Sequence, residues 1–228
     1  MRSRIVLALC ALCALIVLVS VSLYRFFYID SVDSSSMIYT LSEERLVLEA
    51  ERNRSFWKTE RKLESLPYVS KVDFSRSGDV LSILPSYKKG ILIMDDKSLA
   101  FFDGEDVFML EKGDYGRLKR YYVSVSVPSS VFTLLSSFVA DEEASYLLDL
   151  LLETVYNHDL ITSIELSFIS GYETLVINME DYGYVLYAYL PLDKGDLSSS
   201  LDYIQSLGLN IAEDEIYILR DKRLTRAG

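Results

Sequence analysis

Residues 64–74 read ESLPYVSKVDF, and within this stretch the pattern changes from helical to extended. Before it, apolar residues recur at spacings of seven and three, which places them on one face of an amphipathic helix. Pro67 disfavours helical angles at Leu66 and has no amide to donate, so the helix must end there. After it, Val72 and Phe74 alternate with charged residues, which predicts a strand with one buried face.

The segments on either side of this junction complete a small unit. Upstream, residues 42–53 are predicted to form a helix capped either by Thr40 with Glu43 or by Ser42. A short extended segment precedes that helix, and a glycine turn after the junction leads to a second alternating strand. The order strand, helix, helix, strand, strand predicts a compact α+β unit over residues 28–88.

Residues 89–224 are predicted to form a mixed α/β domain built on an extended β-sheet, followed by a short tail at 225–228. Alternation over residues 121–127 (YYVSVSV) predicts one of its strands, and EIYILRDKR, from residue 215 to 223, predicts the last. Two helices interrupt the strands. The first is capped by Asp141, and the second ends at Gly208, which suits a left-handed helix end.

The N-terminal segment predicts a membrane anchor. Residues 5–23 are 19 consecutive positions without a charge, long enough as a helix to span roughly 29 Å of hydrocarbon. Arginines precede this run, so the positive-inside rule favours a cytoplasmic tail at residues 1–4, a transmembrane helix at residues 5–25 and an extracytoplasmic remainder. A cleaved signal peptide is the alternative interpretation.

Composition excludes several functions for the exported part. Three of the 23 Lys and Arg residues precede residue 26, whereas all 34 Asp and Glu follow it, so residues 26–228 carry a net charge of −14. Such a surface repels nucleic acid. Cys10 and Cys13 both lie in the apolar run, so the exported part is expected to hold together without a disulfide.

No catalytic, cofactor-binding or metal-binding residue is assigned. His158 is the only histidine, and no thiol or second histidine is available outside the apolar run for nucleophilic or zinc chemistry. A pair of carboxylates stays open as a catalytic site because the chain has 34 acidic residues. A carboxylate-based enzyme or ligand-binding domain predicts a concave pocket that holds two carboxylates with perturbed pKa values.

Tyrosines crowd one predicted strand. Tyr182 and Tyr184 share one of its faces, and Tyr187 and Tyr189 share the other. Buried tyrosine hydroxyls need hydrogen-bond partners, so one pair is expected to face solvent or a partner protein.

The whole arrangement resembles the FtsQ/DivIB proteins of the bacterial division septum, which carry a cytoplasmic tail, one membrane span, a POTRA domain and a β domain. In these proteins a Leu-Pro-aromatic-Val motif follows the second helix of the POTRA domain. A strand in which apolar and polar residues alternate comes next. The segment LAFFDGEDVFML resembles the hairpin that opens their β domain, and IYILR resembles their terminal strand. Of the family's Glu-x-x-Pro motif after the third POTRA strand, only the proline is present, as Pro85. Ile218 stands where the family's terminal Asp-Leu-Arg strand has Asp. The matching junction residues are Leu66, Pro67, Tyr68, Val69, Val72, Phe74 and Arg76.

The resemblance implies a non-enzymatic scaffold at the septum, anchored in the inner membrane with its N-terminus in the cytoplasm. Its β domain would bind FtsB- and FtsL-like bitopic division proteins, and its POTRA domain other division proteins. We expect a partner strand to add to an unpaired terminal strand, and the acidic surface favours a partner segment that carries Lys or Arg. A POTRA protein of export or outer-membrane assembly is a further alternative. The residues expected to bind the partner are Tyr184, Tyr187, Ile216, Tyr217, Ile218, Leu219 and Arg220.

Overall fold

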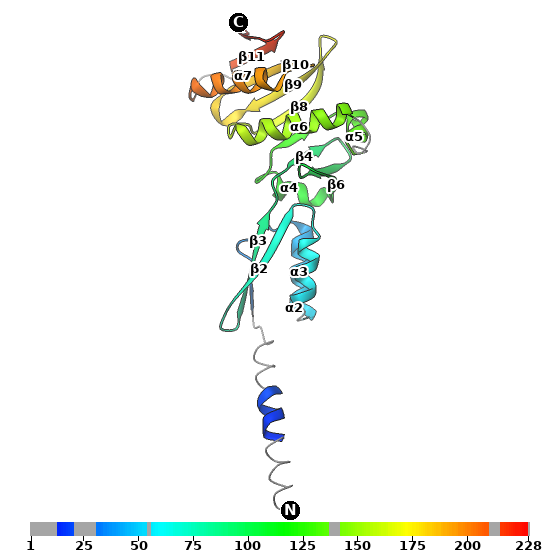
Figure 1. The fold of residues 1–228 in the computed structure, drawn as a ribbon, viewed down its shortest axis with the longest axis vertical. Coiled ribbons are helices and arrows are strands. Elements are labelled where there is room, and N and C mark those ends of the chain that lie inside the picture. Colours follow the sequence, from blue (N-terminus) through cyan, green and yellow to red (C-terminus); the bar gives the residue numbers. More distant parts are fainter. Residues whose placement is uncertain (1–12, 21–30, 54–55, 137–141, 210–214, 228) are drawn as a thin grey trace, which may run out of the picture.

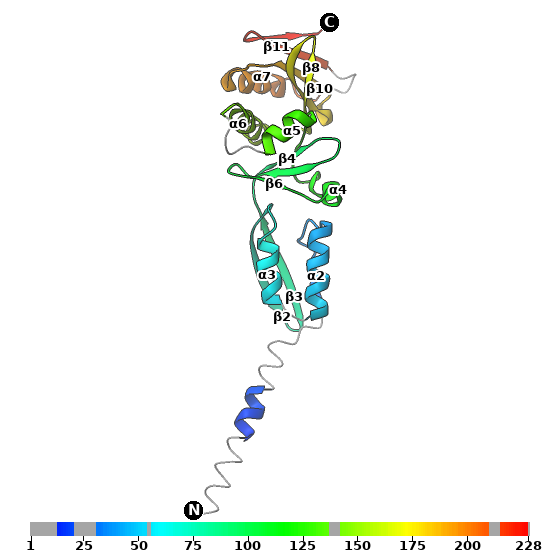
Figure 2. The same cartoon turned by 90° about the vertical axis from the view of Figure 1, so that its right-hand side faces the viewer.

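The computed structural model describes residues 13–20, 31–53, 56–136, 142–209 and 215–227. It is an α+β structure with a three-stranded sheet and a nine-stranded mixed sheet. The described elements form an elongated molecule in which the three-stranded sheet lies between the helical residues 13–20 and the nine-stranded sheet (Figures 1 and 2). Strands β11 and β12 lie at the far end.

The three-stranded unit has the predicted order strand, helix, helix, strand, strand. Its sheet order is β1-β3-β2, with β1 parallel to β3 and β2 antiparallel to it. Both helices lie against one face of the β2–β3 hairpin (Figures 1 and 2). The elements are β1 (Ser31–Asp33), α2 (Leu41–Asn53), α3 (Phe56–Glu64), β2 (Val69–Ser77) and β3 (Val80–Tyr87).

The junction at Pro67 has the predicted structure. Helix α3 ends at Glu64, and the amide of Val69 donates to the carbonyl of Leu66 across the turn (3.0 Å). A bulge follows Val69, so Val69 and Val72 both face inward although they are three residues apart. One face of β2 is therefore buried from the first residue of the strand.

The helix α2 is capped by Thr40 and Glu43, one of the two predicted alternatives. The amide of Thr40 donates to Glu43 Oε2 (2.9 Å), and the amide of Glu43 donates to Thr40 Oγ1 (3.1 Å). Asp114, from the other part of the chain, accepts bonds from the amide (3.1 Å) and hydroxyl (2.7 Å) of Ser42. The N-terminus of α2 is thus closed by both its own residues and a distant carboxylate.

The nine-stranded sheet has the order β12-β11-β10-β9-β8-β7-β4-β5-β6. Helices α6 and α7 cover one face of it (Figures 1 and 2). Its strands are β4 (Ile91–Met94), β5 (Leu99–Phe102), β6 (Val107–Met109), β7 (Ser124–Ser126), β8 (Ser163–Ile169), β9 (Tyr172–Met179), β10 (Tyr184–Tyr189), β11 (Glu215–Arg220) and β12 (Arg223–Arg226). Its helices are η1 (Lys112–Asp114), α4 (Tyr115–Leu118), α5 (Ser129–Ser136), α6 (Glu142–Asn157), η3 (Glu180–Tyr182) and α7 (Lys194–Ser206).

Several predicted elements differ in detail. The strand predicted over residues 121–127 is reduced to β7, because the amides of Tyr121 and Tyr122 bond back to the carbonyl of Leu118 at the end of α4. Helices α4 and α5 were not predicted. The predicted cap Asp141 lies outside the described residues. Gly208 has φ +76° at the end of α7, as expected.

The two sheets share a hydrophobic core. Leu92 and Phe101, on one face of β4 and β5, belong to the same buried cluster as Tyr68 of the three-stranded unit. Ile91 and Phe102, on the other face, belong to the cluster under the helices of the large sheet. The predicted boundary between residues 88 and 89 therefore separates the two sheets, but one hydrophobic cluster spans it.

The predicted transmembrane helix, residues 5–25, lies largely outside the described residues. Its described part, residues 13–20, is helical and exposes apolar side chains. Among the described helices, none is both long enough and apolar enough to cross a membrane.

Candidate functional site

The C-terminal end of the large sheet differs from the prediction in a way that matters for function. The predicted last strand is two strands, because β11 ends at Arg220 and β12 begins at Arg223. Asp221 and Lys222 both have positive φ (49° and 64°), which is the backbone of a two-residue hairpin turn. Strand β11 lies between β10 and β12, so the expectation that residues 216–220 form an unpaired edge is wrong.

The edge of the sheet is formed by β12. In an antiparallel pair, alternate residues bond to the neighbouring strand, and those between them direct their N–H and C=O groups away. The amide of Ala227 donates to the carbonyl of Ile216 (2.9 Å), and Ile218 lies opposite Thr225. Leu224 and Arg226 therefore direct their backbone groups away from β11. Within the part of the chain that the structure describes, no strand lies on that side.

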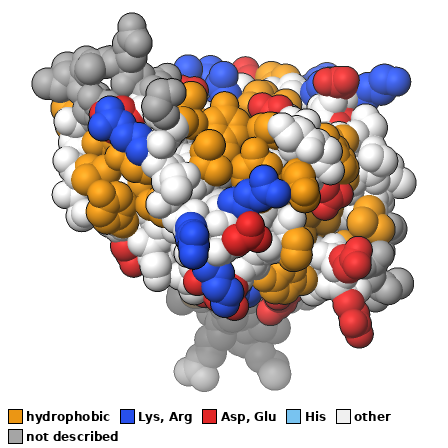
Figure 3. Space-filling model, turned by 90° about the horizontal axis from the view of Figure 1, so that it is seen from above, with side chains coloured by type: hydrophobic (Ala, Val, Ile, Leu, Met, Phe, Trp, Pro, Cys, Tyr) orange, Lys and Arg blue, Asp and Glu red, His pale blue; other side chains and the backbone are white. Residues whose placement is uncertain are grey.

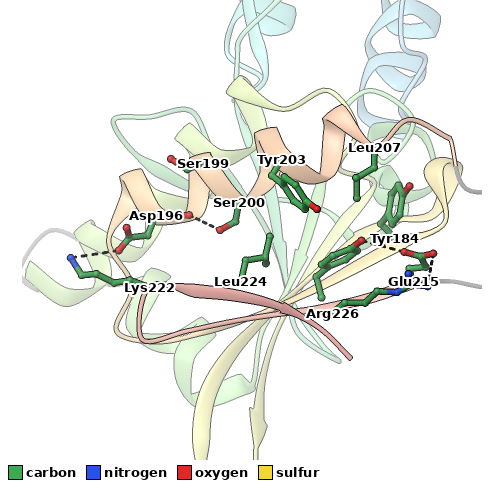
Figure 4. Close-up of a pocket in the computed structure, with 11 residues that line it drawn as sticks. Tyr184, Asp196, Ser199, Ser200, Tyr203, Leu207, Glu215, Lys222, Leu224 and Arg226 are labelled. Carbon is green, nitrogen blue, oxygen red and sulfur yellow. Dashed lines mark hydrogen bonds and ion pairs between the residues drawn. The ribbon is translucent and has the colours of Figure 1, made fainter. Parts of the chain in front are cut away.

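A groove of about 760 Å³ lies beside this edge, between α7 and strands β10 to β12 (Figure 4). The rings of Tyr184 and Tyr217 meet edge to face in it, with centroids 6.1 Å apart. Tyr203 of α7 and Leu207, which follows its last residue, line it from the helix side and are 53% and 41% exposed. Leu224 of β12 lines it from the edge strand.

One ion pair lies at each end of the groove. Glu215 accepts a bond from Arg226 (2.8 Å) and another from the hydroxyl of Tyr217 (3.2 Å). Burial and the neighbouring Glu215 raise the pKa of Tyr217, so this hydroxyl keeps its proton and remains a donor at neutral pH. At the other end, Lys222 Nζ lies 3.7 Å from a carboxylate oxygen of Asp196. Each carboxylate of the groove thus has a cation beside it (Figure 4).

The predicted binding residues are divided between the two faces of the sheet. Tyr184, Tyr217 and Leu219 face the helices, and Leu219 is only 1% exposed, so its side chain packs in the core and is not accessible to a partner. Tyr187 and Ile218 lie on the face that α6 and α7 leave open, where they are partly exposed. The other two, Ile216 and Arg220, lie on this open face and are exposed.

The open face also carries the tyrosine pair expected to face solvent. Tyr187 and Tyr189 are partly exposed there, while Tyr184 is buried against the helices. The guanidinium of Arg220 lies 4.7 Å from the ring centroid of Tyr172 and 5.5 Å from that of Tyr189. These cation–π contacts fix the orientation of the arginine next to the β11–β12 turn.

The edge strand is basic although the chain is acidic. Residues 220–226 contain four Lys or Arg and one Asp, whereas the chain as a whole has a net charge of −11. Figure 3 views this end of the molecule and shows basic side chains beside hydrophobic ones. The overall charge predicts a basic partner, but the charge at the edge itself favours an acidic one.

The sequence offered a weak signal for this site. Asp-Lys is not a strong hairpin dipeptide, so the sequence pattern predicts one strand here and does not mark Leu224 or Arg226 as binding residues. It does not mark the groove residues Tyr203, on α7, and Leu207, just after α7, either. Their exposure depends on which part of α7 faces β12, and helix periodicity alone does not reveal it.

The described residues also contain three buried carboxylates. Glu43, Asp95 and Asp114 are 0%, 8% and 2% exposed, and burial raises the pKa of Glu43. Glu43 and Asp114 serve the N-terminus of α2, and Asp95 accepts bonds from the amides of Lys97 and Ser98 in the turn between β4 and β5. None of the three lines the groove beside β12 or a second groove beside α5. Among the described residues, no group of three or more His, Cys, Asp or Glu could hold a metal ion.

Comparison with known proteins yields no assignment: no family model matches the chain, and no curated protein matches it.

Proposed function

We propose that the chain is a non-enzymatic, membrane-anchored scaffold of the bacterial division septum and a divergent member of the FtsQ/DivIB family. The observation that carries the proposal is the strand order β1-β3-β2 under two helices, followed by a large sheet that ends in the edge strand β12. In this proposal residues 31–87 are a POTRA domain, which contacts other division proteins. The segment 5–25 anchors the chain in the inner membrane, with the N-terminus in the cytoplasm.

The large sheet would bind FtsB- and FtsL-like bitopic proteins by strand addition. A partner strand pairs with the outward backbone groups of Leu224 and Arg226, and its side chains contact the groove on one face and Ile218 on the other. The basic edge favours Asp or Glu in that partner strand. This differs from the basic partner expected from net charge.

Localisation tests the cellular role. A fluorescent fusion of the full chain is expected to gather at midcell before constriction begins. A uniform envelope signal throughout the cell cycle would refute a role at the septum.

A matched pair of substitutions tests the edge strand. Arg226→Pro removes an outward amide, whereas Arg226→Ala loses the same ion pair with Glu215 but keeps the amide. We expect Arg226→Pro to weaken capture of an FtsB-like partner by about tenfold or more relative to Arg226→Ala. Proline at this outward position leaves the pairing between β11 and β12 intact, since the amide does not bond to β11. Equal capture by the two variants would show that no strand adds at β12.

A further inference from the structure

A second groove lies on the helix-covered side of the large sheet, away from the edge strand. It has a volume of about 600 Å³, within the range of about 300–1,000 Å³ typical of pockets that bury ligands. Its walls come from α5, from the first turns of α6 and from the tip of the β8–β9 hairpin. None of the residues that line it is among those expected from the sequence to bind a partner.

The groove is lined by large apolar side chains that solvent reaches. Phe168 is 61% exposed, Tyr146 45% and Leu134 38%. Single exposed apolar residues are common on protein surfaces, but several that meet in one hollow indicate a surface that another molecule covers.

The walls of this groove are held in place by local structure. Ser170 and Gly171 have φ of 53° and 83°, which closes the β8–β9 hairpin in a two-residue turn and fixes where Phe168 and Tyr172 project. The hydroxyl of Tyr146 donates to the carbonyl of Leu192 (2.7 Å). An occupant would therefore meet a preformed surface.

Charge indicates the chemistry of the occupant. Glu142, Glu143 and Glu173 line the groove, and no Lys or Arg is among its described lining residues. An apolar occupant with Lys or Arg beside its apolar side chains would place a cation near these carboxylates.

Strand pairing indicates the occupant's secondary structure. Strand β9 lies between β8 and β10, but β8 pairs with β7 only over residues 163–165, so Leu166 and Phe168 have no strand beside them on that side within the described residues. An extended segment bound along them can pair with this free edge of β8.

We propose that this groove binds an extended segment of a partner protein, with its apolar side chains against Phe168, Tyr146 and Leu134 and with Lys or Arg beside Glu142 and Glu173. The inference does not depend on a role in division, because none of the residues that line this groove lines the groove beside β12.

Photo-crosslinking in cells tests the proposal. The full chain is produced with benzoylphenylalanine in place of Phe168, whose exposure allows the exchange without disturbing the core. The expected product joins position 168 to a segment of a different protein, with apolar residues at alternate positions and Lys or Arg beside them. The probe at Leu48, an equally exposed site on α2, should not yield this product.

Charge variants complete the test. The double variant Glu142→Gln with Glu173→Gln should reduce the crosslink yield by at least about fivefold. Glu165→Gln removes a charge from the opposite face of the same hairpin and should leave the yield unchanged. A crosslink only to lipid or to a second copy of the chain, no crosslink, or a yield that the double variant does not lower would each overturn the proposal.

Discussion

Replacing Phe101 by alanine tests whether the two sheets depend on one shared core. Phe101 is fully buried on the face of β5 that turns toward the three-stranded unit. Its ring packs edge to face on Tyr122 (5.0 Å between centroids) and on Tyr68 (6.4 Å). Because Tyr68 belongs to the small unit, the phenylalanine joins residues from both sides of the predicted boundary.

The expected cost follows from burial. Removing a fully buried phenylalanine ring costs about 3–5 kcal/mol in the free energy of unfolding, through lost transfer energy and the cavity left behind. This is a large share of the about 5–15 kcal/mol that stabilises a typical domain. We expect the loss to fall mainly on the attachment of the three-stranded unit, since the other face of β5 remains packed.

Hydrogen exchange measured by mass spectrometry locates the loss. In Phe101→Ala, amide protection of peptides from β2 and β3 should fall by about 100-fold or more, which corresponds to about 3 kcal/mol. Phe102→Ala is the matched control, because Phe102 is equally buried on the other face of β5. That variant should lower protection in β8 to β10 and in α6 instead.

Either of two results would contradict a core shared by the two sheets. One is a decrease of less than about 1 kcal/mol in the free energy of unfolding of Phe101→Ala, since removing a buried ring from a shared core costs more than this. The other is equal loss of protection in β2–β3 in both variants, which would mean that the two faces of β5 do not pack separately.

Two further predictions concern the same region. Gly90→Ala should destabilise the chain by about 1–3 kcal/mol in urea titrations, because a Cβ there would lie 2.5 Å from the carbonyl oxygen of Phe102; Gly116→Ala, in open space on α4, should not. Burial raises the pKa of Glu43 above its ordinary 4.5, so the folded state retains a proton that the unfolded state releases. The free energy of unfolding relative to Glu43→Gln should thus fall as pH rises above 4.5, then level off; a constant difference between about pH 4 and about pH 8 would contradict this.

Local signals predicted the elements of the small unit well. Pro67 ends α3 because it has no amide and restricts Leu66, and both effects act within a few residues. The capping of α2 by Thr40 and Glu43 likewise involves residues three apart. Patterns of this kind are readable because cause and effect lie in the same short segment.

Other features could not be predicted because they depend on distant residues. Asp114 closes the N-terminus of α2 from 72 residues further along the chain. Alternation over residues 121–127 is a valid strand pattern, yet its start is held in a turn by bonds to Leu118. The turn at Asp221 and Lys222 carries a weak local signal and is favoured by the pairing of β11 with β12.

By itself, the sequence determined the element order of the small unit, an α+β architecture and a mostly β second region, since helix and strand periodicity and turn residues act over short distances. The tertiary structure alone decided that β12 and not β11 is the edge, that Tyr187 lies on the open face while Leu219 is buried, and that the two sheets share a core. These features are set by which strands become neighbours, and strand neighbours are chosen by packing among residues far apart in the chain.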